Sequence, residues 1–117
     1  MNIEEIREYC LSKKGVTECF PFDETTLVFK VMDKMFALTD LVGDLSLTLK
    51  CDPGRAIELR EQYPAILPGY HMSKNHWNTV LVDGSLSKTF ICQLIDHSYD
   101  LVVDKLPRKV QIELAKF

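Results

Sequence analysis

Apolar and polar residues alternate in three segments near the middle of the chain, covering residues 26–31, 35–41 and 45–51. The third segment is the most regular, because Leu47 and Leu49 alternate with polar residues along its length. Successive side chains of a β-strand point to opposite faces, so this pattern predicts strands with one covered face and one face in water. The links between the segments are short, which favours antiparallel hairpins.

Helical spacing of apolar residues predicts four helices, and the residues at two of their starts support the assignment. Asn2 and Glu5 have the spacing of a capping box. Asp52 followed by Pro53 places a capping side chain before a proline at the first helical position. The predicted helices cover residues 3–14, residues 53–62, a segment from a cap at Ser85 or Ser87 to Leu106, and residues 107–117.

One more strand, at residues 79–82, and an extended connection at residues 63–69 complete the predicted order. Strands that follow one another, with helices before and after, are typical of an α+β fold. We therefore expect a two-layer sandwich in which an antiparallel sheet has helices packed on one face. No linker or internal repeat interrupts residues 1–117, which are expected to form a single domain. On the uncovered face of the sheet, the alternation places Lys30, Ser46, Thr48 and Lys50.

Composition and charge limit the classes of protein to which the chain can belong. Hydrophobic residues make up 46% and charged residues 26%, as in ordinary globular domains. The net charge of −3 lowers the expectation of nucleic-acid binding, because such proteins usually carry an excess of Lys and Arg. The first residues are charged and unlike a secretory signal, and no apolar run approaches the roughly 20 residues that span a bilayer. A cytoplasmic protein without a membrane segment is expected.

The cysteines and histidines do not form a recognisable metal or redox motif. None of the four cysteines is spaced as C-x-x-C, so neither a zinc knuckle nor a redox pair is indicated. His71 and His76 lie five residues apart, and a metal ion would need further ligands that the sequence does not place beside them. We expect no metal site and no cofactor.

Motifs for covalent or phosphate chemistry are also missing from the sequence. No serine lies in a G-x-S-x-G elbow, and the five glycines form neither a phosphate-binding loop nor a dinucleotide-binding motif. Adjacent acids such as Glu4 and Glu5 are typical of a helix start. The sequence therefore predicts that the protein is not an enzyme, and no catalytic residue is assigned.

Residues 68–84 concentrate the polar and aromatic side chains that could contact a ligand. Binding of nucleic acid requires Lys or Arg to neutralise phosphate, with polar or aromatic groups to order the contact. A lone tryptophan is also commonly a packing anchor, and lysines near strand edges commonly prevent aggregation. The candidate binding residues are Lys30, Lys34, Lys50, His71, Lys74, Asn75, His76, Trp77 and Asn78.

Three stretches of the sequence resemble the MmcQ/YjbR family. They read FPFDETTLVFKVMDKMFAL, LSLTLKCDPGRAIELREQYPAILPGYHMSKNHWNTVLVDGSL and LIDHSYDLVVDKLP, and they extend from about Phe20 to Pro107. The resemblance implies a fold like that of CyaY and frataxin, with helices on one side of an antiparallel sheet. It also implies DNA binding through hairpins, and it brings no catalytic residues.

The expected function is that of a binding module whose contact surface combines the open sheet face with the loop at residues 68–79. DNA is the ligand that the family resemblance implies. A protein partner or a small ligand at the same surface is the alternative, and the acidic balance of the chain favours it. The sequence leaves the oligomeric state open.

Overall fold

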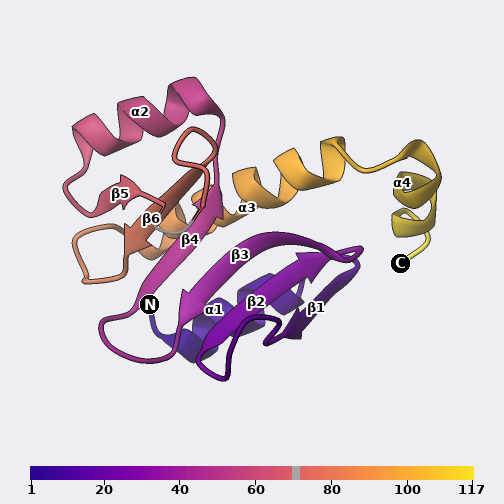
Figure 1. Cartoon of the computed structure of the whole chain (residues 1–117), viewed down its shortest axis with the longest axis horizontal. Helices are drawn as coiled ribbons and strands as arrows, with labels where there is room; N and C mark the ends of the chain where they lie inside the picture. Colours follow the sequence, from indigo (N-terminus) through magenta and orange to yellow (C-terminus); the bar gives the residue numbers. More distant parts are fainter. Residues whose placement is uncertain (70–71) are drawn as a thin grey trace.

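A computed structural model of the protein describes residues 1–69 and 72–117 (Figure 1). The sheet has six strands, and α1, α2 and α3 all contribute to the core on one of its faces. This arrangement confirms the predicted α+β sandwich. The elements are α1 (Ile3–Leu11), β1 (Val16–Cys19), β2 (Thr26–Val31), β3 (Lys34–Asp40), β4 (Ser46–Lys50), α2 (Pro53–Gln62), β5 (Ile66–Pro68), β6 (Trp77–Leu81), α3 (Lys88–Asp104) and α4 (Arg108–Leu114).

The strands lie in the order β1-β2-β3-β4-β6-β5, and every neighbouring pair is antiparallel. In Figure 1, α1 and α3 lie behind the sheet and α2 lies beside β5 and β6. Strand β2 has the predicted bounds, and β3, β4 and β6 differ from prediction by one or two residues. The sequence pattern missed β5, which was expected only as an extended connection because Pro64 precedes it and Pro68 ends it.

The amino-terminal helix is shorter than predicted and ends at Leu11. The chain then turns through Gly15, whose φ of +70° is a conformation that residues with a side chain rarely adopt. A β-carbon at this position would lie 2.5 Å from Leu114 Cδ1 and 3.1 Å from Met32 Sδ. The backbone conformation therefore favours glycine here, and a side chain at this position would also displace Leu114 of α4.

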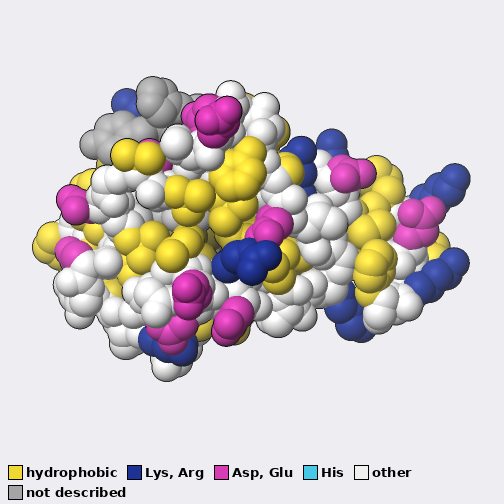
Figure 2. Space-filling view, turned by 90° about the horizontal axis from the view of Figure 1, so that it is seen from below, with side chains coloured by type: hydrophobic (Ala, Val, Ile, Leu, Met, Phe, Trp, Pro, Cys, Tyr) yellow, Lys and Arg dark blue, Asp and Glu magenta, His cyan; other side chains and the backbone are white. Residues whose placement is uncertain are grey.

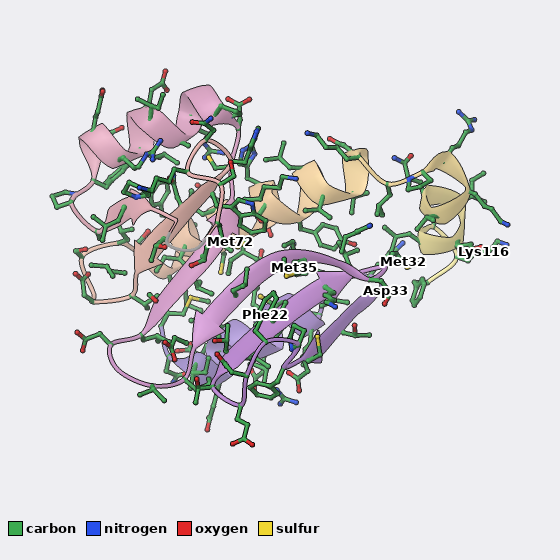
Figure 3. The ribbon with its side chains drawn as sticks, in the orientation of Figure 1. Phe22, Met32, Asp33, Met35, Met72 and Lys116 are labelled. Atoms are coloured by element: carbon green, nitrogen blue, oxygen red, sulfur yellow. The ribbon has the colours of Figure 1, made fainter. Side chains whose placement is uncertain are left out.

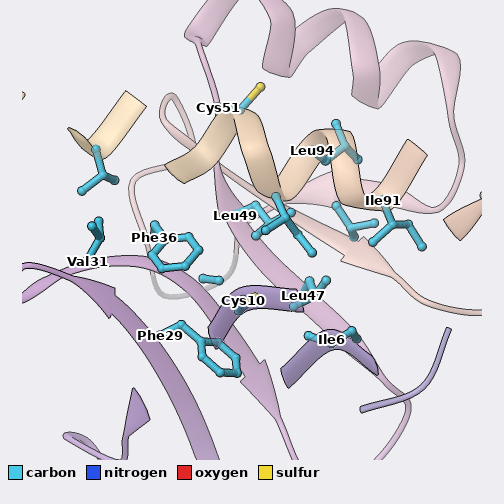
Figure 4. Packing of buried hydrophobic residues seen from close by; sticks show 14 of the residues in the cluster. Ile6, Cys10, Phe29, Val31, Phe36, Leu47, Leu49, Cys51, Ile91 and Leu94 are labelled. Carbon is cyan, nitrogen blue, oxygen red and sulfur yellow. The ribbon is translucent and has the colours of Figure 1, made fainter. Parts of the chain in front are cut away.

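The hydrophobic core fills the space between the helices and one face of the sheet. Figure 4 shows the side chains of Ile6 and Cys10 from α1 and Ile91 from α3 meeting those of Phe29 and Leu47 from the strands. All five are at most 2% exposed. Burial of such side chains contributes about 1.5–3 kcal/mol each for the larger ones, so this layer supplies most of the stabilisation.

The two halves of the sheet are joined by a short ladder between β3 and β4. Only Ala37↔Leu49 and Leu38↔Thr48 are paired in this ladder, and the strands diverge on either side of it (Figure 1). On one side, the Ser98 hydroxyl of α3 donates a hydrogen bond to the Phe36 carbonyl oxygen and accepts one from the Lys50 N–H. On the other side, the Thr39 hydroxyl donates to the Ser46 carbonyl oxygen at 2.8 Å. Side-chain hydroxyls thus replace backbone hydrogen bonds at both ends of the ladder.

Substitution of Ser98 by alanine should destabilise the protein substantially. Ser98 is fully buried, and its loss would leave a backbone carbonyl and a backbone N–H without their partner. Each such orphaned group costs about 1–3 kcal/mol, so we expect Ser98→Ala to lower the free energy of unfolding by about 2–4 kcal/mol. Urea denaturation followed by circular dichroism measures this change. Gln93→Ala, at an exposed position of α3, is the control, and an equal effect of both substitutions would refute the bridging role of Ser98.

A histidine of α3 contacts the backbone at the start of α2. The Asp52 N–H donates a hydrogen bond to His97 Nε2 at 3.2 Å, which requires this nitrogen to be unprotonated. Partial burial lowers the pKa of His97 below its ordinary value of 6.5, and Arg55 adds to the effect. The neutral form of His97 is therefore the form that the fold accommodates.

This lowered pKa predicts a loss of stability in mild acid. Below the unfolded-state pKa near 6.5, the unfolded chain takes up a proton more readily than the folded protein, so stability falls as the pH decreases toward the folded-state pKa. We expect the urea midpoint to fall between about pH 7.5 and about pH 5.5, and to fall less in His97→Gln. Parallel pH curves for the two proteins would contradict the assignment.

Candidate ligand-binding site

The face of the sheet opposite the helices, here called the open face, carries an uncharged row of side chains at its centre. The strand registers place one residue of each strand in this row. Because cross-strand partners point to the same face, the row crosses the entire sheet. Its members are Cys19, Val28, Leu38, Thr48, Thr79 and Leu67.

Charged residues of the open face lie on either side of this row, separated by sign. Lys30 and Lys50 are two residues from the row along one direction, as the alternation predicted, and both are half-buried. Burial lowers the pKa of Lys50, and the positive charge of Lys105 lowers it further. Asp40 lies two residues from the row in the opposite direction. The open face therefore has a basic side and an acidic side.

The open face is less exposed to water than the alternation predicted. Val28, Leu38 and Trp77 form a second, smaller hydrophobic cluster there, and none of the three is more than 8% exposed. Met35 and Met72 pack against this cluster from its surface. The alternation predicted that this face lies in water, and the burial of Val28, Leu38 and Trp77 at its centre departs from that prediction because these side chains pack on one another.

A cavity of about 570 Å³ lies on the open face, and we call it the open-face cavity. Its floor includes Leu38, Thr48 and Thr79 of the uncharged row. Phe22 from the β1–β2 loop and Met72 from the segment before β6 also line it. Figure 3 shows both of these side chains over the strands, with Met35 close by. Three parts of the chain that are distant in sequence thus form one concave site.

Two carboxylates give the open-face cavity its charge. Asp23 Oδ1 accepts hydrogen bonds from the backbone N–H groups of Thr25 at 2.9 Å and Thr26 at 2.6 Å. These bonds hold the pKa of Asp23 below its ordinary value, so the side chain is ionised at neutral pH. Asp40 Oδ1 accepts from the N–H of Val42 at 2.9 Å. Among the described residues that line the cavity, none is Lys or Arg.

The hydroxyl groups of the cavity can order a polar part of a ligand. The hydroxyls of Thr48 and Thr79 lie 3.2 Å apart and share a hydrogen bond, which leaves each with further bonding capacity. The Thr26 hydroxyl donates a 3.1 Å hydrogen bond to Asp23 Oδ2. A site with apolar walls, several hydroxyls and two carboxylates suits a neutral or positively charged organic molecule.

The structure divides the sequence-predicted binding residues among several surroundings. Lys34 is exposed next to the β2–β3 turn, where Met32 and Asp33 have positive φ angles. Trp77 lies buried on the open face, as a packing anchor would. His71 falls outside the described residues. Three further candidates, Lys74, Asn75 and His76, are exposed in the turn that precedes β6.

Asn78 points away from the open face, toward the helices. It is 3% exposed, and its Nδ2 donates a 3.4 Å hydrogen bond to the Ala56 carbonyl oxygen of α2. Its Oδ1 is a buried acceptor with no partner among the described residues. Asn78 therefore cannot contact a ligand bound on the open face, and the prediction that included it among contact residues needs correction.

Two groups of residues were not predicted as functional from the sequence: the loop residues that border the cavity, and a group of exposed cations on another part of the protein surface. Phe22 and Asp23 border the cavity, and the only signal in the sequence was that an aromatic residue directly precedes an acid. Dark blue Lys and Arg side chains stand out over α4 in Figure 2. The exposed cations of α4 and its flanks are Lys105, Arg108, Lys109 and Lys116.

Two further observations concern metals and membranes. Within residues 1–69 and 72–117, no three His, Cys, Asp or Glu side chains are grouped so that they could hold a metal ion. None of the helices described here combines the length and apolar character needed to cross a membrane.

Comparison with known proteins identifies relatives along almost the entire chain. The model of the family described as YjbR matches residues 11–101. The uncharacterized protein YjbR of Escherichia coli (strain K12) is 36% identical over 118 residues, which cover 97% of the chain and 100% of that protein. The uncharacterized protein YbdF of Escherichia coli O157:H7 is 37% identical over 92% of the chain and 89% of its own length.

Solved structures share the fold. The crystal structure of Deinococcus radiodurans protein DR2400, a DUF419 domain, has a TM-score of 0.92 and 41% identity, covering 97% of this chain and 88% of that one. A crystal structure of a Pseudomonas syringae protein has a TM-score of 0.76 and 31% identity, covering 86% of this chain and 98% of that one. The α+β sandwich is therefore a fold that this chain shares with these solved structures.

Proposed function

The chain belongs to the YjbR family, and from its structure we propose that it is a non-catalytic binding domain that holds a small organic ligand in the open-face cavity. The observation that carries this proposal is the cavity itself. Its volume of about 570 Å³ lies within the range of roughly 300–1,000 Å³ that is usual for ligand sites. Its lining combines apolar side chains with a few polar groups, which is the usual composition of such sites.

The charge of the cavity supports a neutral or cationic ligand. Asp23 and Asp40 line the cavity, whereas Lys30 and Lys50 lie outside the lining. An anionic ligand would approach two carboxylates without a compensating cation in the described lining, and like charges in a partly water-excluded site repel strongly. An ammonium group beside either carboxylate would instead form a charge-assisted hydrogen bond.

Paired small molecules of opposite charge test this proposal. We expect phenethylamine to shift the ¹H–¹⁵N NMR signals of Leu38, Thr48 and Thr79 in a saturable manner, and 3-phenylpropanoate to shift them far less. The aromatic ring would contact Phe22 and Met72, and the ammonium group would face the carboxylates. Saturable shifts caused equally by both compounds would contradict the assigned charge preference.

A substitution that fills the cavity supplies the matched control. Thr48→Phe should abolish the phenethylamine shifts, because the larger side chain would occupy the floor of the site. Thr89→Phe makes the same change at an exposed position of α3 and should leave binding intact. Thermal denaturation of both variants establishes that they are folded at the temperature of the titration. Unchanged binding by folded Thr48→Phe would place the ligand elsewhere.

DNA binding is a second candidate function, which the family resemblance implies. The observation in its favour is the group of exposed cations at α4 and the end of α3, namely Lys105, Arg108, Lys109 and Lys116. Such cations neutralise phosphates. The acidic open-face cavity argues against DNA contact there, so this candidate uses a different surface from the one expected from the sequence.

A salt titration of binding to duplex DNA tests the second candidate. Contact through α4 predicts that affinity falls steeply with salt, and that Arg108→Ala and Lys109→Ala each reduce the salt slope by about one. The variant with Lys30→Ala, Lys50→Ala and Lys74→Ala would then behave as the unmodified protein. Loss of DNA binding in this triple variant would indicate that DNA contacts the open face instead of α4. If the unmodified protein binds no DNA even at low salt, DNA binding is ruled out as a function.

A further inference from the structure

We propose that the natural occupant of the open-face cavity is a segment of another protein in which apolar side chains are flanked by Lys or Arg. This inference rests on the proposed function and names the class of its ligand. An apolar side chain of the partner would enter the cavity. The partner's neighbouring apolar and basic side chains would contact the β1–β2 loop and the β3–β4 loop, which border the cavity.

The β1–β2 loop and the β3–β4 loop carry exposed apolar side chains, one of which also lines the cavity. Of seven large hydrophobic side chains that are exposed in the described residues, four lie here: Phe20 (47% exposed), Phe22 (62%), Leu41 (47%) and Val42 (64%). We call these four residues the apolar shelf. Phe22 belongs to both the shelf and the cavity lining. A concentration of exposed apolar side chains on one edge is typical of an interaction site.

The shelf is a defined structure because its two loops are tied together. The N–H of Leu41 donates a 2.8 Å hydrogen bond to the carbonyl oxygen of Thr25, which links the β3–β4 loop to the β1–β2 loop. The Asp23 and Asp40 carboxylates each close a turn within their own loop. A partner would therefore meet a largely preformed surface, which reduces the entropy lost on binding.

The charge of the two loops determines the partner. Residues 20–26 and 40–46 contain four acids and no Lys or Arg. Figure 2 shows acidic side chains beside hydrophobic ones on the face that includes this edge of the molecule. Such a surface attracts Lys and Arg and repels anionic lipid and nucleic acid. The four acids are Asp23, Glu24, Asp40 and Asp44.

The cavity can accommodate partners with different apolar residues. Met35 and Met72 pack on the surface of the open-face cluster, and Met72 forms part of the cavity wall. Methionine side chains are flexible and polarisable, so they adjust to apolar groups of different shape. We therefore expect the protein to recognise the apolar and basic character of a partner segment more than one particular amino-acid sequence.

A second copy of this chain is the competing occupant. Its α4 region presents the exposed residues Ile112 and Phe117 among the cations Arg108, Lys109 and Lys116. A head-to-tail contact of this kind would not close on itself unless the copies formed a ring. For this reason we favour a separate protein over a second copy of the chain.

Two blocked synthetic peptides, KRLFLRK and EELFLEE, test the inference because they share an apolar centre and differ in charge. Fluorescence anisotropy with labelled peptides should give at least about tenfold tighter binding of the basic peptide, as several favourable charge contacts together would produce. NMR shifts should include the signals of both the cavity floor and the apolar shelf. Equal affinity for both peptides, or shifts confined to another surface, would overturn the inference.

Charge reversal at two acids of the loops that carry the apolar shelf provides the matched variants. Glu24→Lys with Asp44→Lys avoids the turn-forming carboxylates and should weaken the basic peptide about tenfold. Glu58→Lys with Glu61→Lys makes the same change of charge on exposed positions of α2 and should leave affinity within about twofold. A similar loss in both variants would show only a general charge effect and would overturn the assignment of the shelf.

The phenethylamine titration separates failure of this inference from failure of the proposed function. Cavity shifts with phenethylamine but no binding of the basic peptide would retain the small-ligand site and reject the protein partner. No cavity shifts with either probe would reject both. Analytical ultracentrifugation detects self-association of the protein. If the protein self-associates, does so no longer with Glu24→Lys and Asp44→Lys, and binds no peptide, the surface belongs to a second copy and the inference is overturned.

Discussion

The ladder between β3 and β4, with its two hydroxyl bridges, is the contact on which the rest of the structure depends. Two residue pairs alone join one half of the sheet to the other by backbone pairing. Ser98 fills the separation at one end and Thr39 fills it at the other. Ser98 belongs to α3, so the long helix holds the two halves together while it covers them. The divergence of the strands also matters for the site, because Thr39 and Ser46 line the open-face cavity.

The distribution of charge gives the molecule distinct ends. The uncharged row crosses the middle of the open face, acids lie on the side of the β1–β2 and β3–β4 loops, and exposed cations gather around α4. The net charge of −3 for the chain therefore does not represent the local charge at either end of the molecule. Any partner that responds to charge would therefore approach the protein in a preferred orientation.

Much of the fold could be predicted because local patterns agreed with the tertiary arrangement. Alternation along residues 45–51 correctly placed Leu47 and Leu49 in the core, and Asp52 before Pro53 correctly marked the start of α2. Lys30 and Lys50 share a face for the same reason. The short strand β5 was missed because its three residues, one of them Pro68, carry no alternation of their own.

The site was less predictable because it depends on register and on loops. Thr48 and Thr79 become neighbours only because β6 pairs with β4, which no local pattern specifies. Phe22 and Met72 reach the cavity from loops that lie far apart in the sequence. Trp77 and Asn78 stood out by residue type, yet burial removed Asn78 from the open face and made Trp77 part of a packed cluster.

The absence of a side chain at Gly15 has a consequence for how the carboxyl-terminal helix presents its charges. Leu114 is the only residue of α4 that the structure describes as buried, and it rests where a β-carbon at position 15 would have to be. The space left by Gly15 thus contributes to the packing of α4 against the body of the protein, together with the half-buried Val110 and the hydrogen bonds that Gln111 Nε2 donates to the carbonyl oxygens of Val103, Asp104 and Leu106. A side chain at position 15 would displace Leu114 and loosen this packing, so the cations Arg108 and Lys109 would be positioned less firmly relative to the sheet.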